Sequence, residues 1–525
     1  MVGGVGRTGM FLLSLLALGQ GASGQPCPPL QVGNPDGNYI VPGVQGAIPY
    51  SGGLALDAYV QPGPDRRPAV VVIHGGGWTS GSRIAHVGQL LEMVTRAGYH
   101  WFSVDYRLAG AVGIEQSLAD VRAALAFIRC HAREFKVDPA RVLLLGEDAG
   151  ADLASMLAVP GDDGVLGAVL IGGIYEPGGT ADALTGVAAG AHAPPGRQRP
   201  AVFMIHGGAD RDVPVDRARR VCSALAQARH RCEFLEVAGA SHRVENWWPS
   251  QWSYKRAVVA WLSALAPAGP APVTAPGGPL RKDIVYARSP EVKLDAFVPP
   301  AAKPGPGVIL VHGGGWEAGD KVTYITPLFE PLARAGLAWV SIEYRLTPAF
   351  THEDQLEDLR RAIRFVRTEH ARFNIDPARI VLVGESASGQ MVTRIAAEDR
   401  SLSGVVSFYG VYDLPAMVTD ASPRSLLVRL FRRTVLDDEA RALLRSHSPL
   451  YLAHSDMPPV LLVNGTADPL TKQAHAYASR LTELGVRHDV IQLEGAPHGM
   501  ENWEGHDDWM IYKRRVVDWI AGLFR

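Results

Sequence analysis

Short, continuous apolar runs alternate with longer amphipathic segments along most of this chain. Typical runs read AVVVIHG from Ala69, RVLLLGE from Arg141 and PAVFMIHG from Pro200, whereas SLADVRAALAFIRCHAREF from Ser117 has helical spacing. Runs of Val, Ile and Leu without polar alternation indicate strands that are buried on both faces. The pattern therefore predicts an α/β fold, in which a mostly parallel sheet is flanked by helices on each side.

The same pattern occurs twice. The segment FKVDPARVLLLGEDAGADLA, which begins at Phe135, returns 238 positions later as FNIDPARIVLVGESASGQMV. The segment HGGGW at His74 returns at the same distance, at His312. Within these repeats Asp148 of the first copy is matched by Ser386 of the second. The constant shift predicts two tandem copies of one α/β domain.

An insertion and a linker complete the predicted domain plan. The later matching residues are further apart: Asp210 and Asp468 by 258 positions, and His242 and His498 by 256. The second copy therefore gains about twenty residues between Tyr412 and Asp468. This insertion is either a cap over a site or a surface excursion. The segment APAGPAPVTAPGGP is too rich in Pro, Ala and Gly to form a core. We expect domains at residues 25–265 and 280–525, joined by a linker at residues 266–279.

The N-terminus has the order of a secretory signal peptide. Arg7 precedes the apolar run Met10–Gly19, and small residues follow it. We therefore expect residues 1–24 to be a signal peptide and the protein to be secreted or periplasmic. A membrane anchor or a frayed N-terminus is the alternative. The apolar run is short for a bilayer span, and no stable membrane insertion is expected.

Composition narrows the classes of partner. The chain has 525 residues, which is too many for one ordinary core. Its formal charge is −2 and it has no basic run, so a nucleic-acid partner is not expected. Export permits disulfides among Cys27, Cys130, Cys222 and Cys232. Three pairings or four buried thiols are open, and we favour Cys222–Cys232. The Cys and His spacing predicts no metal site.

The second copy carries the residue types of a nucleophilic site. The pentapeptide GESAS, centred on Ser386, follows an apolar strand and begins a helix, which is the context of a nucleophile on a tight turn. Ser388 stands where glycine is usual. A serine hydroxyl needs a base, and the base needs an orienting acid. We expect Ser386 to be the nucleophile, His498 the general base and then acid, and Asp468 its orienting carboxylate.

A developing oxyanion needs preplaced hydrogen-bond donors, and glycine amides offer them without a side chain in the way. We expect this oxyanion hole to consist of the amides of Gly314, Gly315 and Ala387. Glu385, beside the nucleophile, is expected to be a buried support for the turn and not an acid–base group.

These motifs resemble the α/β-hydrolase superfamily, in the carboxylesterase and lipase-like branch with HGGGW and G-[DEH]-S-A-G-G. The resemblance covers residues 52–265 and 279–525 and includes similarity to bacterial feruloyl and acetyl-xylan esterases. It implies that an ester, on a small molecule or a polysaccharide, is hydrolysed through an acyl-enzyme without a cofactor. Arylformamidases share a similar His-Gly-Gly-x-Trp loop. An arylformamidase, a serine peptidase and a binding protein without turnover are therefore the alternatives.

The first copy keeps HGGGW, Asp210 and His242 but has Asp148 at the nucleophile position. One interpretation is an aspartate nucleophile, because haloalkane dehalogenases and epoxide hydrolases resemble this copy at that position. The other is an inactive site, in which Asp148 pairs with protonated His242 and occupies the oxyanion hole. We favour the inactive site. The amides expected to bind the carboxylate are those of Gly76, Gly77 and Ala149.

Overall fold

The computed structural model describes most of the chain. It covers residues 27–35, 37–161, 163–175, 199–269, 279–422 and 425–525. The predicted signal peptide at residues 1–24 lies outside the described residues, as does most of the predicted linker, at residues 270–278. Within the described parts, every helix is too short or too polar to cross a membrane.

The first sheet has nine strands in the order β1-β2-β3-β5-β4-β6-β7-β8-β9. β1, β2, β3 and β5 pair antiparallel in succession, and the remaining pairs are parallel. The strands are β1 (Asn34–Pro35), β2 (Gln45–Ser51), β3 (Leu54–Tyr59), β4 (Arg67–Ile73), β5 (His100–Val104), β6 (Val137–Glu147), β7 (Gly167–Ile171), β8 (Ala201–Gly207) and β9 (Cys232–Val237).

The second sheet repeats the order of β2 to β9, as β10-β11-β13-β12-β14-β15-β16-β17. The register repeats as well, because Ile73 pairs with Gly146 in the first sheet and Val311 pairs with Gly384 in the second. The strands are β10 (Leu280–Arg288), β11 (Glu291–Phe297), β12 (Gly305–Val311), β13 (Ala338–Ile342), β14 (Ile375–Glu385), β15 (Gly404–Phe408), β16 (Val460–Gly465) and β17 (His488–Leu493).

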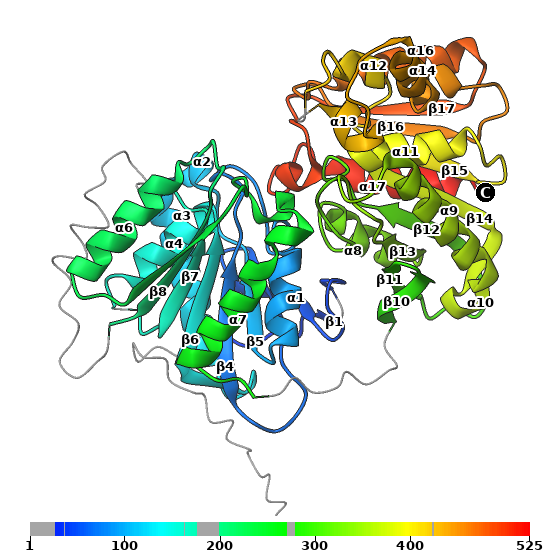
Figure 1. Ribbon diagram of the computed structural model, residues 1–525. Coiled ribbons are helices and arrows are strands. Elements are labelled where there is room, and N and C mark those ends of the chain that lie inside the picture. Colours follow the sequence, from blue (N-terminus) through cyan, green and yellow to red (C-terminus); the bar gives the residue numbers. More distant parts are fainter. Residues whose placement is uncertain (1–26, 36, 162, 176–198, 270–278, 423–424) are drawn as a thin grey trace, which may run out of the picture.

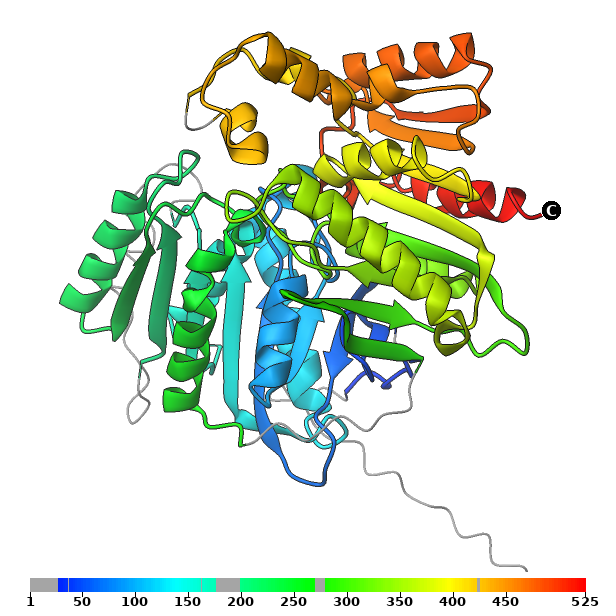
Figure 2. The ribbon, with the colours of Figure 1, turned by 45° about the vertical axis from the view of Figure 1, so that its right-hand side comes forward.

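Helices cover both faces of each sheet (Figures 1 and 2). In the first domain they are α1 (Gly88–Arg96), α2 (Ala109–Val112), α3 (Ile114–Cys130), α4 (Ala149–Ala158), α6 (Val215–Gln227) and α7 (Ser253–Leu265). In the second they are α8 (Phe329–Arg334), α9 (His352–Thr368), α10 (His370–Phe373), α11 (Ala387–Ala396), α12 (Leu414–Met417), α13 (Leu426–Phe431), α14 (Asp438–Ser446), α15 (Pro449–Leu452), α16 (Thr471–Glu483) and α17 (Ile511–Gly522). The prediction of two α/β domains with mostly parallel sheets is confirmed.

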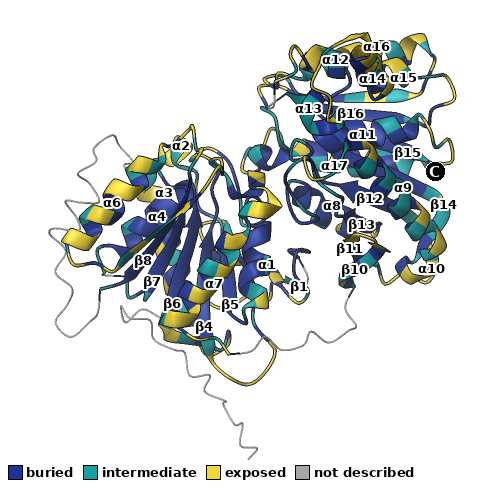
Figure 3. Ribbon diagram, viewed as in Figure 1, coloured by how far each residue is buried: buried dark blue, intermediate teal, exposed yellow. Residues whose placement is uncertain are grey.

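The two domains share a hydrophobic core. One face of the first sheet packs under α3, α4 and α6, and one face of the second sheet packs under α9, α11 and α16. The opposite faces belong to a single apolar cluster that runs through α1 and α7 of the first domain and α8 and α17 of the second. Figure 3 shows the central strands of each sheet buried, with many of the exposed positions on the outer helices. The domains are therefore joined by packing as well as by the chain.

Polar contacts also cross between the domains. Gln89 Nε2 donates to Thr323 Oγ1 at 3.1 Å, and the amide of Gly81 donates to the carbonyl of Glu504 at 3.1 Å. An ion pair at the edge of the contact joins an arginine of α1 to an aspartate of β10, Arg96 and Asp283, at 2.8 Å. These contacts fix the orientation of one domain against the other.

All four cysteines form disulfides. The favoured pair, Cys222–Cys232, is confirmed, and Cys27 pairs with Cys130. The first disulfide links positions 10 residues apart, and the second links positions 103 residues apart. Both disulfides lie in the first domain. Cys27–Cys130 ties the segment before β1 to the end of α3, and Cys222–Cys232 ties α6 to β9.

The two disulfides are expected to contribute unequally to stability. In the chain-entropy model a disulfide stabilises by restricting the unfolded chain, by about 3 kcal/mol for a loop near 15 residues and about 4.7 kcal/mol for one near 100. Cys27→Ala should therefore lower the free energy of unfolding of the first domain more than Cys232→Ala does. Urea unfolding of the two variants, followed by tryptophan fluorescence, measures the difference. Equal losses, or a larger loss in Cys232→Ala, would contradict this expectation.

Candidate active site

Ser386 lies at the apex of a strained turn between β14 and α11. Its φ of 55° is in the left-handed region, which a non-glycine residue adopts only where the surroundings enforce it. The turn also needs Gly384, because a Cβ there would be 2.5 Å from the carbonyl oxygen of Ser388. Ser388, at the usual glycine position, is accommodated by donating its hydroxyl to the carbonyl of Val311 at 2.6 Å. The strand–turn–helix expected around the nucleophile is present.

The three predicted triad residues come together at the carboxyl ends of their strands. Ser386 Oγ lies 2.9 Å from His498 Nε2, and His498 Nδ1 lies 2.7 Å from Asp468 Oδ2. Asp468 follows β16, His498 follows β17, and the aspartate side chain is fully buried. With the Nδ1 proton held by the carboxylate, Nε2 is left to accept the serine proton.

The glycine-rich segment after β12 passes beside the turn. Gly314 and Gly315 have φ values of 90° and 61°, and a Cβ on Gly314 would be 2.2 Å from the carbonyl of Ala318. Ala387, the third predicted donor residue, is the first residue of α11. Glycine at position 314 is therefore required by both conformation and space.

Glu385 is buried beneath this segment, as expected for a support of the turn. A Cβ on Gly313 would be 2.0 Å from Glu385 Oε1, so the carboxylate of Glu385 fits here only because residue 313 has no side chain. Burial raises the pKa of Glu385 to about 7, against the opposing effects of His498 and of the hydrogen bonds from Gly313 and Tyr409.

The first domain shows how the equivalent site accommodates an aspartate. Asp148 has the same strained backbone, with φ of 52°. Its Oδ2 accepts hydrogen bonds from the amides of Gly76 at 2.9 Å and Gly77 at 2.6 Å, which are the counterparts of Gly314 and Gly315. Its Oδ1 is 3.3 Å from His242 Nε2, and His242 Nδ1 is 2.8 Å from Asp210 Oδ2. A fixed carboxylate oxygen thus occupies the position between the two glycine amides.

The charges of this first-domain cluster are stabilised by one another. Burial disfavours the charged form of Asp148, but the hydrogen bond and charge of His242 lower the pKa of Asp148 to about 2. Burial also disfavours the imidazolium, yet Asp148 and Asp210 together raise the pKa of His242 to about 10. At neutral pH His242 is therefore protonated and has no lone pair with which to act as a base.

A cavity of about 480 Å³ opens above Ser386 and His498, and both domains line it. Its second-domain wall includes Gly314 and Gly315. Its first-domain wall is formed by His86 and by residues between positions 239 and 251, including Arg243 and Trp248. The insertion of the second copy, with helices α12 to α15, contributes no described residue to the lining. It packs on the core of the second domain, and Arg429 of α13 forms an ion pair with the lining residue Glu317 at 2.5 Å. The first domain supplies the wall of the cavity that a cap could have formed.

Sequence reasoning missed several residues around this cavity. The ring of Tyr409 packs against the imidazole of His498 with centroids 4.6 Å apart, and its hydroxyl accepts from the amide of Met500 at 2.7 Å. Arg243, Glu501 and Asn502 also line the cavity. A signal for the last two existed, because Glu-Asn-Trp follows the histidine in both copies, but it did not reveal that the two loops meet.

Two groups of described residues bring possible metal ligands close together. They are His86, Glu245 and Glu501 between the domains, and Asp210, Asp212 and His242 in the first domain. In each group the imidazole Nδ1 has a carboxylate oxygen within 3.0 Å, and the guanidinium of Arg243 is 3.7 Å from Glu245. Imidazole protons and the arginine can therefore balance these carboxylates.

The chain is similar to proteins that are described as ester hydrolases. The BD-FAE family model matches residues 56–170 and 294–481, which together are more than half of the chain and fall in both domains. The probable carboxylic ester hydrolase LipM of Mycobacterium tuberculosis is 28% identical over 36% of this chain and 47% of LipM. Esterase LipC of the same organism is 28% identical over 43% of this chain and 61% of LipC. The chain thus spans about half the length of these curated relatives.

The fold, the strained turn at Ser386 and the order of the site residues along the chain define an α/β-hydrolase. Within that class, the chain belongs to the BD-FAE family.

The ion pair of the first domain predicts a stability that depends on pH. Asp148 contributes above its unfolded pKa of 3.8, and its contribution is lost as the pH falls through about 2. His242 contributes below its unfolded pKa of 6.5, and its contribution is lost as the pH rises through about 10. Asp148→Asn should lower the free energy of unfolding by about 3 kcal/mol between these two unfolded pKa values, and by less at either extreme.

Urea unfolding of the wild type and Asp148→Asn across this pH range tests the expectation. Asp138→Asn, which removes a half-exposed ion pair with Arg141, is the matched control and should show a small loss. A loss in Asp148→Asn that stays constant across the whole range would contradict the charged assignment.

Proposed function

We propose that the chain is a serine carboxylic ester hydrolase whose second domain performs the reaction. The observation that carries this proposal is the contact series Ser386–His498–Asp468, at 2.9 and 2.7 Å, at the floor of a cavity beside Gly314 and Gly315. The esterase names of the relatives and the BD-FAE membership support the same reaction class.

In the proposed first half-reaction, Ser386 Oγ attacks the ester carbonyl carbon while His498 Nε2 takes the serine proton. Asp468 holds the imidazole and stabilises the imidazolium that forms. The negative charge on the former carbonyl oxygen is bound by the amides of Gly314, Gly315 and Ala387, and each such donor contributes about 3–4 kcal/mol. His498 then gives the proton to the departing alcohol, which leaves an acyl group on Ser386.

In the proposed second half-reaction, water attacks the acyl carbon and gives a proton to His498. The tetrahedral intermediate forms in the same place and collapses as His498 returns the proton to Ser386 Oγ. The carboxylic acid is released, and the enzyme regains its starting protonation state. No step requires a cofactor.

The substrate we propose is an extracellular ester, such as an acetyl or feruloyl ester of a plant polysaccharide. The similarity of the motifs to feruloyl and acetyl-xylan esterases supports this class, as does the expected export of the protein to the periplasm or medium. The cavity of about 480 Å³ offers space for a substituent of the size of one or two rings.

We further propose that the first domain does not catalyse. Its nucleophile position holds an aspartate that is bound to two glycine amides and to a protonated histidine. A carboxylate fixed in this way is neither free to attack nor able to leave the position where an oxyanion would form. The aspartate-nucleophile mechanism is therefore the less favoured alternative.

Three proteins and a substrate panel test these proposals. Wild type, Ser386→Ala and Asp148→Asn are assayed on aryl acetates, longer acyl esters, methyl ferulate and acetylated xylan. Ser386→Ala should lose more than about 10⁴-fold in kcat, because the triad acts as a unit. Asp148→Asn should keep its esterase activity.

Other results would redirect the assignment. Near-full activity in Ser386→Ala would overturn the proposed nucleophile. Turnover of a haloalkane or epoxide that disappears in Asp148→Asn would establish a reaction in the first domain. Preference for N-formyl aryl amides or for peptides would favour an arylformamidase or a peptidase on the same fold.

A further inference from the structure

The loop that carries the catalytic histidine is held by the other domain. After His498, the segment 499–505 runs along the first domain and makes hydrogen bonds with it at three successive points. The points of contact on the first domain are His86, Arg243 and Gly81. A catalytic imidazole on a loop depends on such supports, because a displacement of about 1 Å can lower the rate about 100-fold.

The most direct support runs through Asn502. Arg243 Nη1 of the first domain donates to Asn502 Oδ1 at 3.0 Å, and Asn502 Nδ2 donates to the backbone carbonyl of His498 at 2.8 Å. The amide of Asn502 therefore connects the guanidinium of one domain to the main chain of the catalytic histidine of the other. Arg243 is three-quarters buried, so this connection is shielded from solvent.

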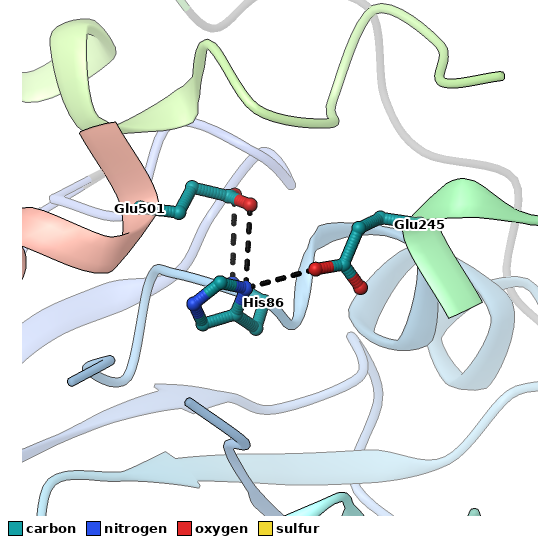
Figure 4. A group of neighbouring side chains, drawn as sticks. All are labelled: His86, Glu245 and Glu501. Carbon is teal, nitrogen blue, oxygen red and sulfur yellow. Dashed lines mark hydrogen bonds and ion pairs between the residues drawn. The ribbon is translucent and has the colours of Figure 1, made fainter. Parts of the chain in front are cut away.

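A second support lies next to it, around Glu501 (Figure 4). Glu501 Oε1 accepts from the amide of His86 at 3.4 Å, and Glu501 Oε2 is 3.4 Å from His86 Nδ1. The same Nδ1 is 3.0 Å from Glu245 Oε1. His86, Glu245 and Glu501 are 6%, 4% and 6% exposed, so His86 connects two buried carboxylates across the contact between the domains, Glu245 through its imidazole and Glu501 through its main-chain amide.

The catalytic loop cannot supply the arginine itself. The two copies are 256 positions apart in this region, so the counterpart of Arg243 in the second domain is Gly499. Gly499 has φ of 97°, where a side chain would be strained. The contact is also reciprocal, because Tyr324 Oη of the second domain donates to the carbonyl of Glu245 at 2.8 Å in the first. Each histidine loop is thus held by the opposite domain.

We propose that the first domain positions the catalytic histidine of the second, through Arg243 acting on Asn502 and His86 acting on Glu501. This inference rests on the proposed function of Ser386 and His498. It gives the first domain a role in catalysis although its own site is blocked. Arg243 and His86 are positioning residues, because each acts through a residue of the histidine loop and not on the reacting atoms.

The test compares Arg243→Ala, Asn502→Ala and the double variant with a matched control. The control is Arg96→Ala, which also removes an arginine contact between the domains, at 2.8 Å to Asp283, but lies away from the histidine loop and the cavity. Arg243→Ala and Asn502→Ala should each lower kcat on an aryl acetate by about 10- to 100-fold with little change in KM. The double variant should lose little more than either single variant, because the two residues form one connection.

Chemical rescue separates positioning from general stability. Arg243 lines the cavity, so added guanidinium chloride, at concentrations well below those that unfold the protein, should restore part of the kcat of Arg243→Ala and none of that of Asn502→Ala. His86→Ala should lower kcat in the same direction. Unchanged kcat in Arg243→Ala, an equal loss in Arg96→Ala, or additive losses in the double variant would overturn the proposal.

A second readout keeps this inference distinct from the proposed function. The rate at which a fluorophosphonate labels Ser386 depends on activation of the serine by His498 but not on the identity of the natural ester. Slower labelling in Arg243→Ala than in Arg96→Ala supports positioning, even if none of the tested esters is turned over. If labelling of the wild type is absent, or persists in Ser386→Ala, the proposed nucleophile itself is wrong. Arg243→Lys, with an intermediate labelling rate, serves where Arg243→Ala does not fold.

Discussion

The burial of two sheet faces in one shared core is the constraint on which the rest of this structure depends. Each domain covers one face of its sheet with its own helices, whereas the other faces belong to a common cluster built from α1, α7, α8 and α17. Separating the domains would expose the part of this apolar surface that lies between them, such as the contact of Tyr39 with Phe297, at a cost of about 25 cal/mol for each Å². The hydrophobic effect therefore holds the two domains together, and the polar contacts between their loops fix the orientation of one against the other.

One strained turn is used twice, and the side chain at its apex decides what the site can do. Ser386 and Asp148 have nearly the same backbone angles, and each lies close to a histidine and to a glycine-rich segment. A serine leaves the amides free for an oxygen of the substrate. An aspartate carries a second oxygen that reaches the amides itself, and its charge keeps the histidine protonated. In the proposed mechanism, the exchange of one residue therefore replaces an oxyanion site with an internal ion pair.

A domain with such a blocked site still has a physical reason to be kept. Its loop at residues 239–251 forms one wall of the cavity above Ser386, and Arg243 contacts the segment that follows His498. A related fold often closes its site with an inserted cap, but the inserted helices of the second domain do not line this cavity. The neighbouring domain occupies that place instead. The cavity at the proposed catalytic centre is thus formed by both domains.

The sequence by itself determined the elements of each domain and the site residues within it. Apolar runs, a glycine-rich turn and the order of Ser386, Asp468 and His498 are local signals, because each is written in a few consecutive residues at the end of a strand. The tertiary structure alone decided which loops of different domains meet. Arg243 and His86 carry no local mark of their proposed role, and the repeated Glu-Asn-Trp marks Glu501 without showing which residues it contacts. These contacts depend on how two distant apolar faces pack, and that packing is encoded over the whole chain.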